Sequence, residues 1–107
     1  MAKSDKLLDN AISSYKTCIK IDAGYYEVFY SLANVMRDKG LFGEAIHYYK
    51  MAITINKDVG KVHCNLGNVY CSLDMKDEAI IEFNEAIRCD GKDMIAIRGL
   101  ATLLSRI

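Results

Sequence analysis

Apolar residues recur at helical intervals along almost the whole chain. Ala45, Tyr49, Ala52 and Ile53 lie at i, i+4, i+7 and i+8, which places them on one face of a helix and would not suit a strand. Turn-forming residues such as Asp38-Lys39-Gly40 interrupt the pattern, and the chain contains no Pro that would break a helix. The pattern predicts an all-α chain with helices near 5–20, 25–38, 42–55, 59–72, 76–89 and 93–106.

The same pattern returns every 34 residues, in two kinds of segment. One kind, which we call the B helix, aligns Ala11 with Ala45 and Ala79, Tyr15 with Tyr49 and Phe83, and Cys18 with Ala52 and Ala86. The other kind, the A helix, aligns Leu32, Leu66 and Leu100, each followed by a small residue: Ala33, Gly67 or Ala101. Small residues let two helices approach closely, and a period of 20 to 50 residues is typical of repeat proteins. The chain is therefore predicted to be a stack of helix pairs.

The repeated residues resemble the signature of the tetratricopeptide repeat. The motif L-A/G-x-x-Y followed by A-x-x-x-F/Y-x-x-A is present as Leu66, Gly67, Tyr70, Ala79, Phe83 and Ala86. The resemblance implies a right-handed α-solenoid of antiparallel helix pairs, here six helices in B-A-B-A-B-A order. Two features depart from the family pattern. The usual Pro is replaced by Ala23, Lys57 and Gly91, and the usual Trp by Phe29, His63 and Ile97.

Counting the repeats predicts incomplete pairs at both ends. We expect a single domain over 1–107, made of an orphan B helix at 1–25, full repeats at 26–59 and 60–93, and an orphan A helix at 94–107. The last helix is apolar where a terminal cap should be polar. We expect the chain either to be part of a longer solenoid or to self-associate through Ile97, Leu100, Leu104 and Ile107.

The resemblance implies a concave wall lined by the A helices, so the polar face of these helices is the candidate partner-binding surface. Its residues are Glu27, Tyr30, Asn34, Arg37, Lys61, Cys64, Asn65, Asn68, Cys71, Arg98 and Thr102. Asn34 and Asn68 occupy the same repeat position, and an amide both donates and accepts hydrogen bonds. They are suited to the backbone of an extended peptide. The alternative is a solvated polar face.

Two specialised groups of the family offer further comparisons. The run Asn65-Leu66-Gly67-Asn68 is similar to the asparagine ladder in the repeat arm of O-linked N-acetylglucosamine transferases, although Ser31 and Gly99 interrupt the ladder. A second group grips the terminal carboxylates of heat-shock chaperone tails. Asn34 and Asn65 match that group, but Tyr30, Ile95 and Gly99 stand where it has cations. Carboxylate binding is therefore not expected.

Composition and charge exclude several other functions. Fourteen basic residues balance fourteen acidic ones without a basic run, which argues against nucleic acid and anionic membrane as partners. No apolar run is long enough to span a bilayer, and the N-terminus lacks a signal-peptide core. We expect a cytoplasmic or nuclear protein.

Site chemistry is equally sparse. Cys18, Cys64, Cys71 and Cys89 form no CxxC pair, so we expect reduced thiols and no metal site. His47 and His63 stand in no triad spacing, so we expect no enzyme activity, no cofactor and no small-molecule substrate. The leading hypothesis is a module that binds a protein or extended peptide. The alternatives are the substrate-recruiting arm of a glycosyltransferase and a structural role through homo-oligomers.

Overall fold

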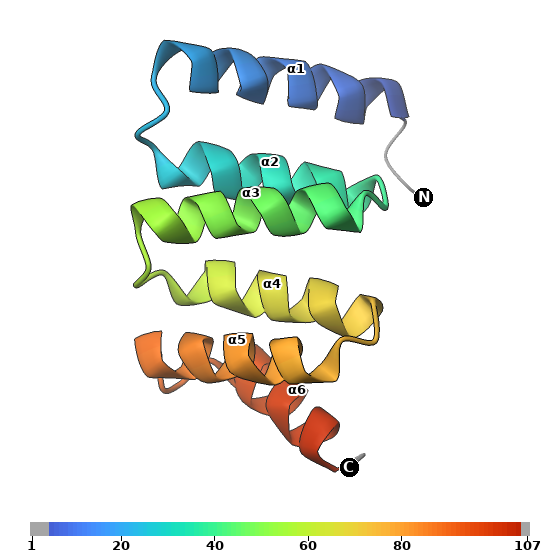
Figure 1. Cartoon of the computed structure of the whole chain (residues 1–107), viewed down its shortest axis with the longest axis vertical. Coiled ribbons are helices and arrows are strands. Elements are labelled where there is room, and N and C mark those ends of the chain that lie inside the picture. Colours follow the sequence, from blue (N-terminus) through green and yellow to red (C-terminus); the bar gives the residue numbers. More distant parts are fainter. Residues whose placement is uncertain (1–4, 106–107) are drawn as a thin grey trace. The chain divides into compact units, whose positions relative to one another are not determined.

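The computed structural model describes residues 5–105, and these residues form six α-helices and no strand (Figure 1). The helices are α1 (Asp5–Ile21), α2 (Tyr26–Asp38), α3 (Phe42–Ile55), α4 (Gly60–Ser72), α5 (Lys76–Cys89) and α6 (Met94–Leu104). The all-α prediction is confirmed, and each helix lies within two residues of its predicted bounds. The helical period of the apolar residues was a sufficient signal because every helix buries one face.

The turns that follow α2 and α4 repeat the same backbone geometry. Gly40 and Asp74, 34 residues apart, both have positive φ, at 80° and 58°. The next residue in each turn donates its N–H back into the helix, from Leu41 to Met36 and from Met75 to Tyr70. This left-handed ending satisfies the last carbonyls of a helix, and Asp is one of the few residues besides Gly that tolerate it. The A helices α2 and α4 therefore reverse tightly into the B helices α3 and α5.

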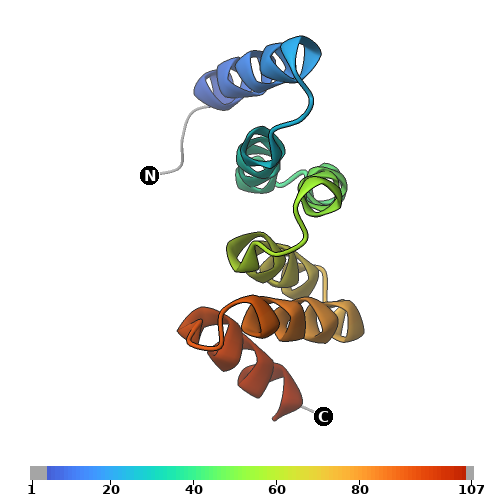
Figure 2. The ribbon, with the colours of Figure 1, turned by 90° about the vertical axis from the view of Figure 1, so that its left-hand side faces the viewer.

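The helices divide into two compact units, Met1–Lys57 and Asp58–Ile107. In the first unit α2 contacts both α1 and α3 (Figure 2). The core of this unit combines Phe29, Leu32, Ala33 and Met36 of α2 with Ala45, Tyr49 and Ala52 of α3, all at most 2% exposed. The rings of Phe29 and Tyr48 stack at a centroid distance of 6.3 Å. The residues that recur in the sequence are thus the residues that join an A helix to its B helix.

In the second unit α5 contacts both α4 and α6. Its core is centred on Phe83 of α5, which is fully buried. The Asp93 carboxylate caps α6 by accepting hydrogen bonds from the N–H groups of Ile95 and Ala96, both at 3.1 Å. The expected single domain and the handedness of the superhelix stay predictions.

Candidate functional site

A hollow of about 380 Å³ lies in the second unit, bounded by α4, α6 and the start of α5. Phe83 and Leu103 are buried at its base. Its remaining lining residues are Asn68, Cys71, Asp74, Lys76, Ile95, Arg98, Gly99 and Thr102. Four of the predicted partner-binding residues are therefore brought together here: Asn68, Cys71, Arg98 and Thr102.

The base of the hollow is fixed by two glycines that hold the Phe83 ring. A Cβ built on Gly67 of α4 would lie 2.8 Å from Cε1 of the ring, and one built on Gly99 of α6 would lie 2.9 Å from Cζ. Neither distance is compatible with a side chain. The absence of a Cβ at both positions lets α4 and α6 approach the ring from two sides.

The corresponding residues of the first unit have a different role. The Tyr49 hydroxyl, at the repeat position of Phe83, donates a hydrogen bond to Oδ1 of Asn34. It also accepts one from Nη1 of Arg37 at 3.4 Å. Asn34 and Arg37 are both partly buried. These two predicted partner-binding residues therefore serve the core of the first unit, which their helical position alone does not reveal.

Phe83 has no hydroxyl, and this changes the surroundings of Asn68. Asn68 and Cys71 stand 34 residues after Asn34 and Arg37, but Asn68 is exposed. Within residues 5–105 the Asn68 side chain makes no hydrogen bond. Its amide lines the hollow with its donors and acceptor available for a ligand.

Cys64 is buried, contrary to the prediction that its side chain faces a partner. It is 5% exposed, and desolvation together with the nearby Asp93 carboxylate raises the pKa of its thiol to about 11. The prediction from helical spacing did not take into account that the start of α6, with its N-cap Asp93, lies close to Cys64.

The other predicted residues lie outside the hollow. Glu27 and Lys61 are exposed, whereas Tyr30 and Asn65 are half-buried. Tyr30 packs against Tyr49, with ring centroids 6.1 Å apart. Among the predicted self-association residues, Leu104 is 53% exposed and Ile97 and Leu100 are half-buried, while Ile107 lies outside the described residues.

Asp74 and Lys76 also line the hollow, and a prediction restricted to the A helices misses them. Asp74 lies in the turn between α4 and α5, and Lys76 is the first residue of α5. One difference between the repeats in the sequence points to the hollow. Phe83 replaces Tyr49 at the same repeat position, whereas Asn34, which binds the Tyr49 hydroxyl, has an asparagine counterpart in Asn68.

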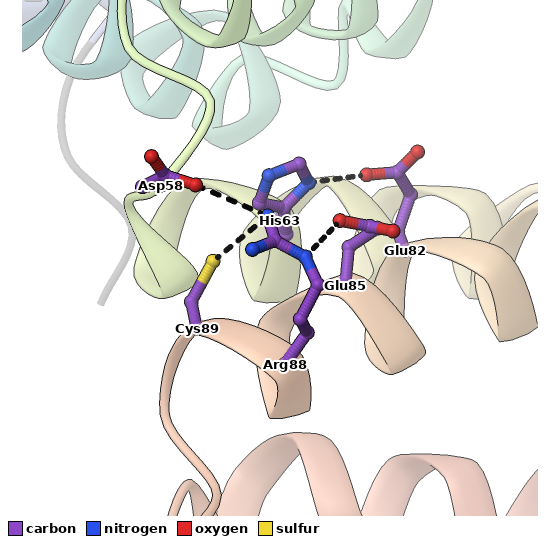
Figure 3. A network of polar contacts seen from close by, with 6 residues as sticks. All are labelled: Asp58, His63, Glu82, Glu85, Arg88 and Cys89. Carbon is purple, nitrogen blue, oxygen red and sulfur yellow. Dashed lines mark hydrogen bonds and ion pairs between the residues drawn. The ribbon is translucent and has the colours of Figure 1, made fainter.

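A polar network joins α4 to α5 (Figure 3). Nδ1 of the buried His63 lies 2.8 Å from Oε1 of Glu82. Nε of Arg88 donates to Glu85 at 2.8 Å, and its Nη2 donates to Asp58 at 3.3 Å. The hydrogen bond from Arg88 holds the pKa of the Glu85 carboxyl below its usual range.

None of these network residues lines the hollow over Phe83. The pair of His63 and Glu82 occupies the repeat position of the stacked pair of Phe29 and Tyr48. Its role is therefore to hold an A helix to its B helix, which positions Phe83.

A second hollow, of about 360 Å³, lies in the first unit and is almost entirely apolar. It is lined by Lys16, Ile19, Lys20, Ala23, Phe29, Tyr48 and Met51. None of these residues was predicted to bind a partner.

Several kinds of site are missing from the part of the chain that the structure describes. In residues 5–105 no three His, Cys, Asp or Glu side chains are grouped to hold a metal ion. The four cysteines, all within this range, form no disulfide. No helix of the described part has the length and apolar character needed to cross a bilayer.

Comparison with known proteins gives a match to a repeat family. The family model described as tetratricopeptide repeat matches residues 26–59 and 60–93. A UDP-N-acetylglucosamine–peptide N-acetylglucosaminyltransferase from Giardia intestinalis is 29% identical over 80 residues. That alignment covers 75% of this chain but 5% of the transferase. Both resemblances inferred from the sequence are confirmed, and the chain spans only a small part of this relative.

Solved structures share the fold over almost the whole chain. The crystal structure of MamA has a TM-score of 0.87 and 25% identity, covering 92% of this chain and 58% of that one. The first TPR domain of Spaghetti (RPAP3), bound to the HSP90 peptide SRMEEVD, has a TM-score of 0.89. It is 17% identical, and the match covers 94% of this chain and 80% of that one. At this identity the likeness establishes the fold.

Proposed function

This chain belongs to the tetratricopeptide repeat family, and we propose that it binds an extended segment of a partner protein in the hollow over Phe83. Its fold is that of a protein-interaction module. The observation that carries the proposal is the side chain of Asn68. It lines the hollow, is exposed, and makes no hydrogen bond within the described residues, whereas its counterpart Asn34 is bound to Tyr49.

The lining of the hollow defines the chemistry of the segment it would accept. Phe83, Ile95 and Leu103 offer an apolar base and wall for one apolar side chain of the ligand. The Asn68 amide donates and accepts, so it suits the N–H and C=O groups of a peptide backbone. Asp74, Lys76 and Arg98 supply charges of both signs, so no strongly charged ligand is favoured.

A peptide with an acidic C-terminus is a poor candidate for this hollow. The Spaghetti (RPAP3) structure holds the peptide SRMEEVD, which ends in an acidic residue. In this chain Ile95 presents an apolar side chain to the hollow and Gly99 lies against the Phe83 ring. Charge-assisted hydrogen bonds to several carboxylates would need more cations than the hollow contains. We propose that SRMEEVD binds weakly or not at all.

The test is selection of binders from a library of random dodecapeptides, followed by affinity measurement by fluorescence polarisation. We expect selected peptides to carry an apolar residue near their centre. Asn68→Ala and Ile95→Glu should each weaken the best peptide about tenfold, which corresponds to about 1.4 kcal/mol. Asn84→Ala removes an exposed amide of α5 outside the hollow and serves as the matched control, with unchanged affinity.

Two outcomes would count against the proposal. One is unchanged affinity in both Asn68→Ala and Ile95→Glu. The other is tight binding of SRMEEVD, since that peptide would need a cationic site that the hollow does not provide.

A second candidate function is supported by the match to the Giardia transferase. The proposal is that this chain is the substrate-recruiting arm of a glycosyltransferase whose catalytic part lies elsewhere. In either case we propose that these residues bind and do not catalyse. The discriminating experiment is to ask whether peptides selected on this chain act as acceptors when the full-length protein is supplied with UDP-N-acetylglucosamine.

A further inference from the structure

The open face of α6 is the face that α2 and α4 use to bind a B helix. In α2 and α4 this face meets the next helix through equivalent pairs, Phe29 with Tyr48 and His63 with Glu82. The following positions on the face, Leu32, Ala33 and Met36 in α2 and Leu66, Gly67 and Tyr70 in α4, are all buried. In α6 the same repeat positions are Ile97, Leu100, Ala101 and Leu104. Ala101 is exposed and Leu104 is 53% exposed. This face of α6 has the composition of a B-helix site without the B helix.

The helix α1 shows the reciprocal defect. Three positions on each B helix face its A helix, and in α3 and α5 all of them are fully buried. They are Ala45, Tyr49 and Ala52 in α3, and Ala79, Phe83 and Ala86 in α5. The same repeat positions in α1 are Ala11, Tyr15 and Cys18. Ala11 and Tyr15 are only half-buried and Cys18 is exposed. α1 is thus a B helix whose A-binding face is open.

We infer that α1 of one copy packs on α6 of a second copy and completes a repeat between the two molecules. The pairs that join A and B helices fix the register of this contact. Adding 34 to both residue numbers of the pair Phe29 and Tyr48 gives the pair His63 and Glu82, and the next A-helix residue is Ile97. Its B-helix partner is supplied by Ser14 of α1 in the second copy, because Ser14 occupies the same repeat position as Tyr48 and Glu82. Tyr15 covers Ala101, just as the Phe83 ring covers Gly67.

The polar end of Tyr15 also finds a suitable residue in this register. Tyr49 places its hydroxyl between Asn34 and Arg37. The residue of α6 at the position of Asn34 is Thr102, whose hydroxyl donates to the Arg98 carbonyl at 2.9 Å. A hydroxyl that donates in this way still has lone pairs, so Thr102 accepts a hydrogen bond from Tyr15.

Such a contact joins two different surfaces, so it is heterologous. After the first contact the pair of molecules retains one open α1 and one open α6, so the assembly continues into a chain or closes into a ring. This distinguishes it from a symmetric dimer, in which α6 would meet α6. Charge does not oppose the contact, because the chain has a formal net charge of zero at pH 7.

The test uses variants that block one end each, measured by sedimentation equilibrium of the full 107-residue chain. Cys18→Arg places a charge on the open face of α1, and Ala101→Arg does the same on α6. Both residues are exposed in the single chain, so the helices should form as before, which circular dichroism checks. Neither of the two substituted residues lines the hollow over Phe83, and because Thr102 does line it, the assembly is measured without peptide.

The wild-type chain should show an average mass that rises with concentration above the 12.0 kDa of one molecule. Each variant alone should stay at 12.0 kDa. An equimolar mixture should reach twice that mass and no more, because one intact α6 meets one intact α1. Ile81→Arg, on the exposed face of α5, is the control and should assemble like the wild type.

Three results would overturn the inference: a wild-type chain that stays at the mass of one molecule up to millimolar concentration, a variant that assembles alone like the wild type, and a mixture that does not associate. If Cys18→Arg loses helix content, Ser14→Arg on the same face replaces it in the same comparison.

Discussion

Asn34 and Asn68 illustrate how one residue type at one repeat position takes two roles. Their repeat position does not distinguish them. The difference lies in the residue opposite, which carries a hydroxyl in Tyr49 and none in Phe83. A buried phenol needs a hydrogen-bond partner, so Asn34 is committed to the core. Opposite Asn68 the Phe83 ring carries no hydroxyl, so Asn68 has no phenol to bind.

The two asparagines should therefore differ in their effect on stability. Asn34→Ala removes the hydrogen bond that the buried Tyr49 hydroxyl donates to Oδ1 of Asn34 and should lower the free energy of unfolding by about 1–2 kcal/mol. Asn68→Ala removes an exposed amide and should change it by less than about 0.5 kcal/mol. Urea denaturation followed by circular dichroism measures both. Equal losses in the two variants would contradict the assignment of Asn34 to the core.

Cys64 gives a prediction about alkaline pH. Its folded-state pKa of about 11 lies above the ordinary value of 9.0, so the folded chain holds the thiol proton more tightly than the unfolded chain does. The resulting stability is present below pH 9 and is lost as pH rises towards 11. Cys64→Ala should make the decline of stability between these values shallower than in the wild type. Identical pH profiles in denaturant titrations would show that Cys64 does not contribute.

At the scale of elements, the approach of three helices depends on one ring. Phe83 of α5 is held between Gly67 of α4 and Gly99 of α6, and it is 0% exposed. In the first unit the residue at the repeat position of Gly67 is Ala33, and the residue at the position of Phe83 is Tyr49. The two glycines are consequences of packing on both faces of a phenylalanine.

Gly67→Ala should destabilise the chain even though Ala favours helix. The new Cβ would lie 2.8 Å from Cε1 of the Phe83 ring, so the ring or one of the packed helices would have to shift. Overpacking of this kind costs about 1–3 kcal/mol, which exceeds the helix-propensity gain of about 1 kcal/mol.

The control for this variant is Gly43→Ala in α3, where an added Cβ meets nothing within 4 Å. That substitution should be neutral or stabilising. A Gly67→Ala protein with an unchanged midpoint in thermal melting would show that the Phe83 ring moves freely.

At the scale of the whole molecule, each of the two units contains one complete A–B pair and one further helix. In Met1–Lys57 the further helix is α1, and in Asp58–Ile107 it is α6. Repeat proteins bury their apolar faces only against neighbouring repeats, so these two helices present the surfaces on which the proposed association would depend. The assembly experiment above addresses this scale, and the peptide experiment addresses the hollow between α4 and α6.

The sequence by itself determined the six helices, their two alternating kinds and the period of 34, because each of these follows from local spacing of apolar and small residues. Helical spacing placed Asn68 with Cys71 and Arg98 with Thr102 on polar helix faces, and the resemblance to the repeat family implied that these faces share one candidate surface. Only the tertiary structure decided that Asn34 and Arg37 bind Tyr49, that Cys64 is buried, and that Asp74 and Lys76 join the hollow. These outcomes depend on which residue a neighbouring helix places opposite, and helical periodicity in one segment contains no information about that contact.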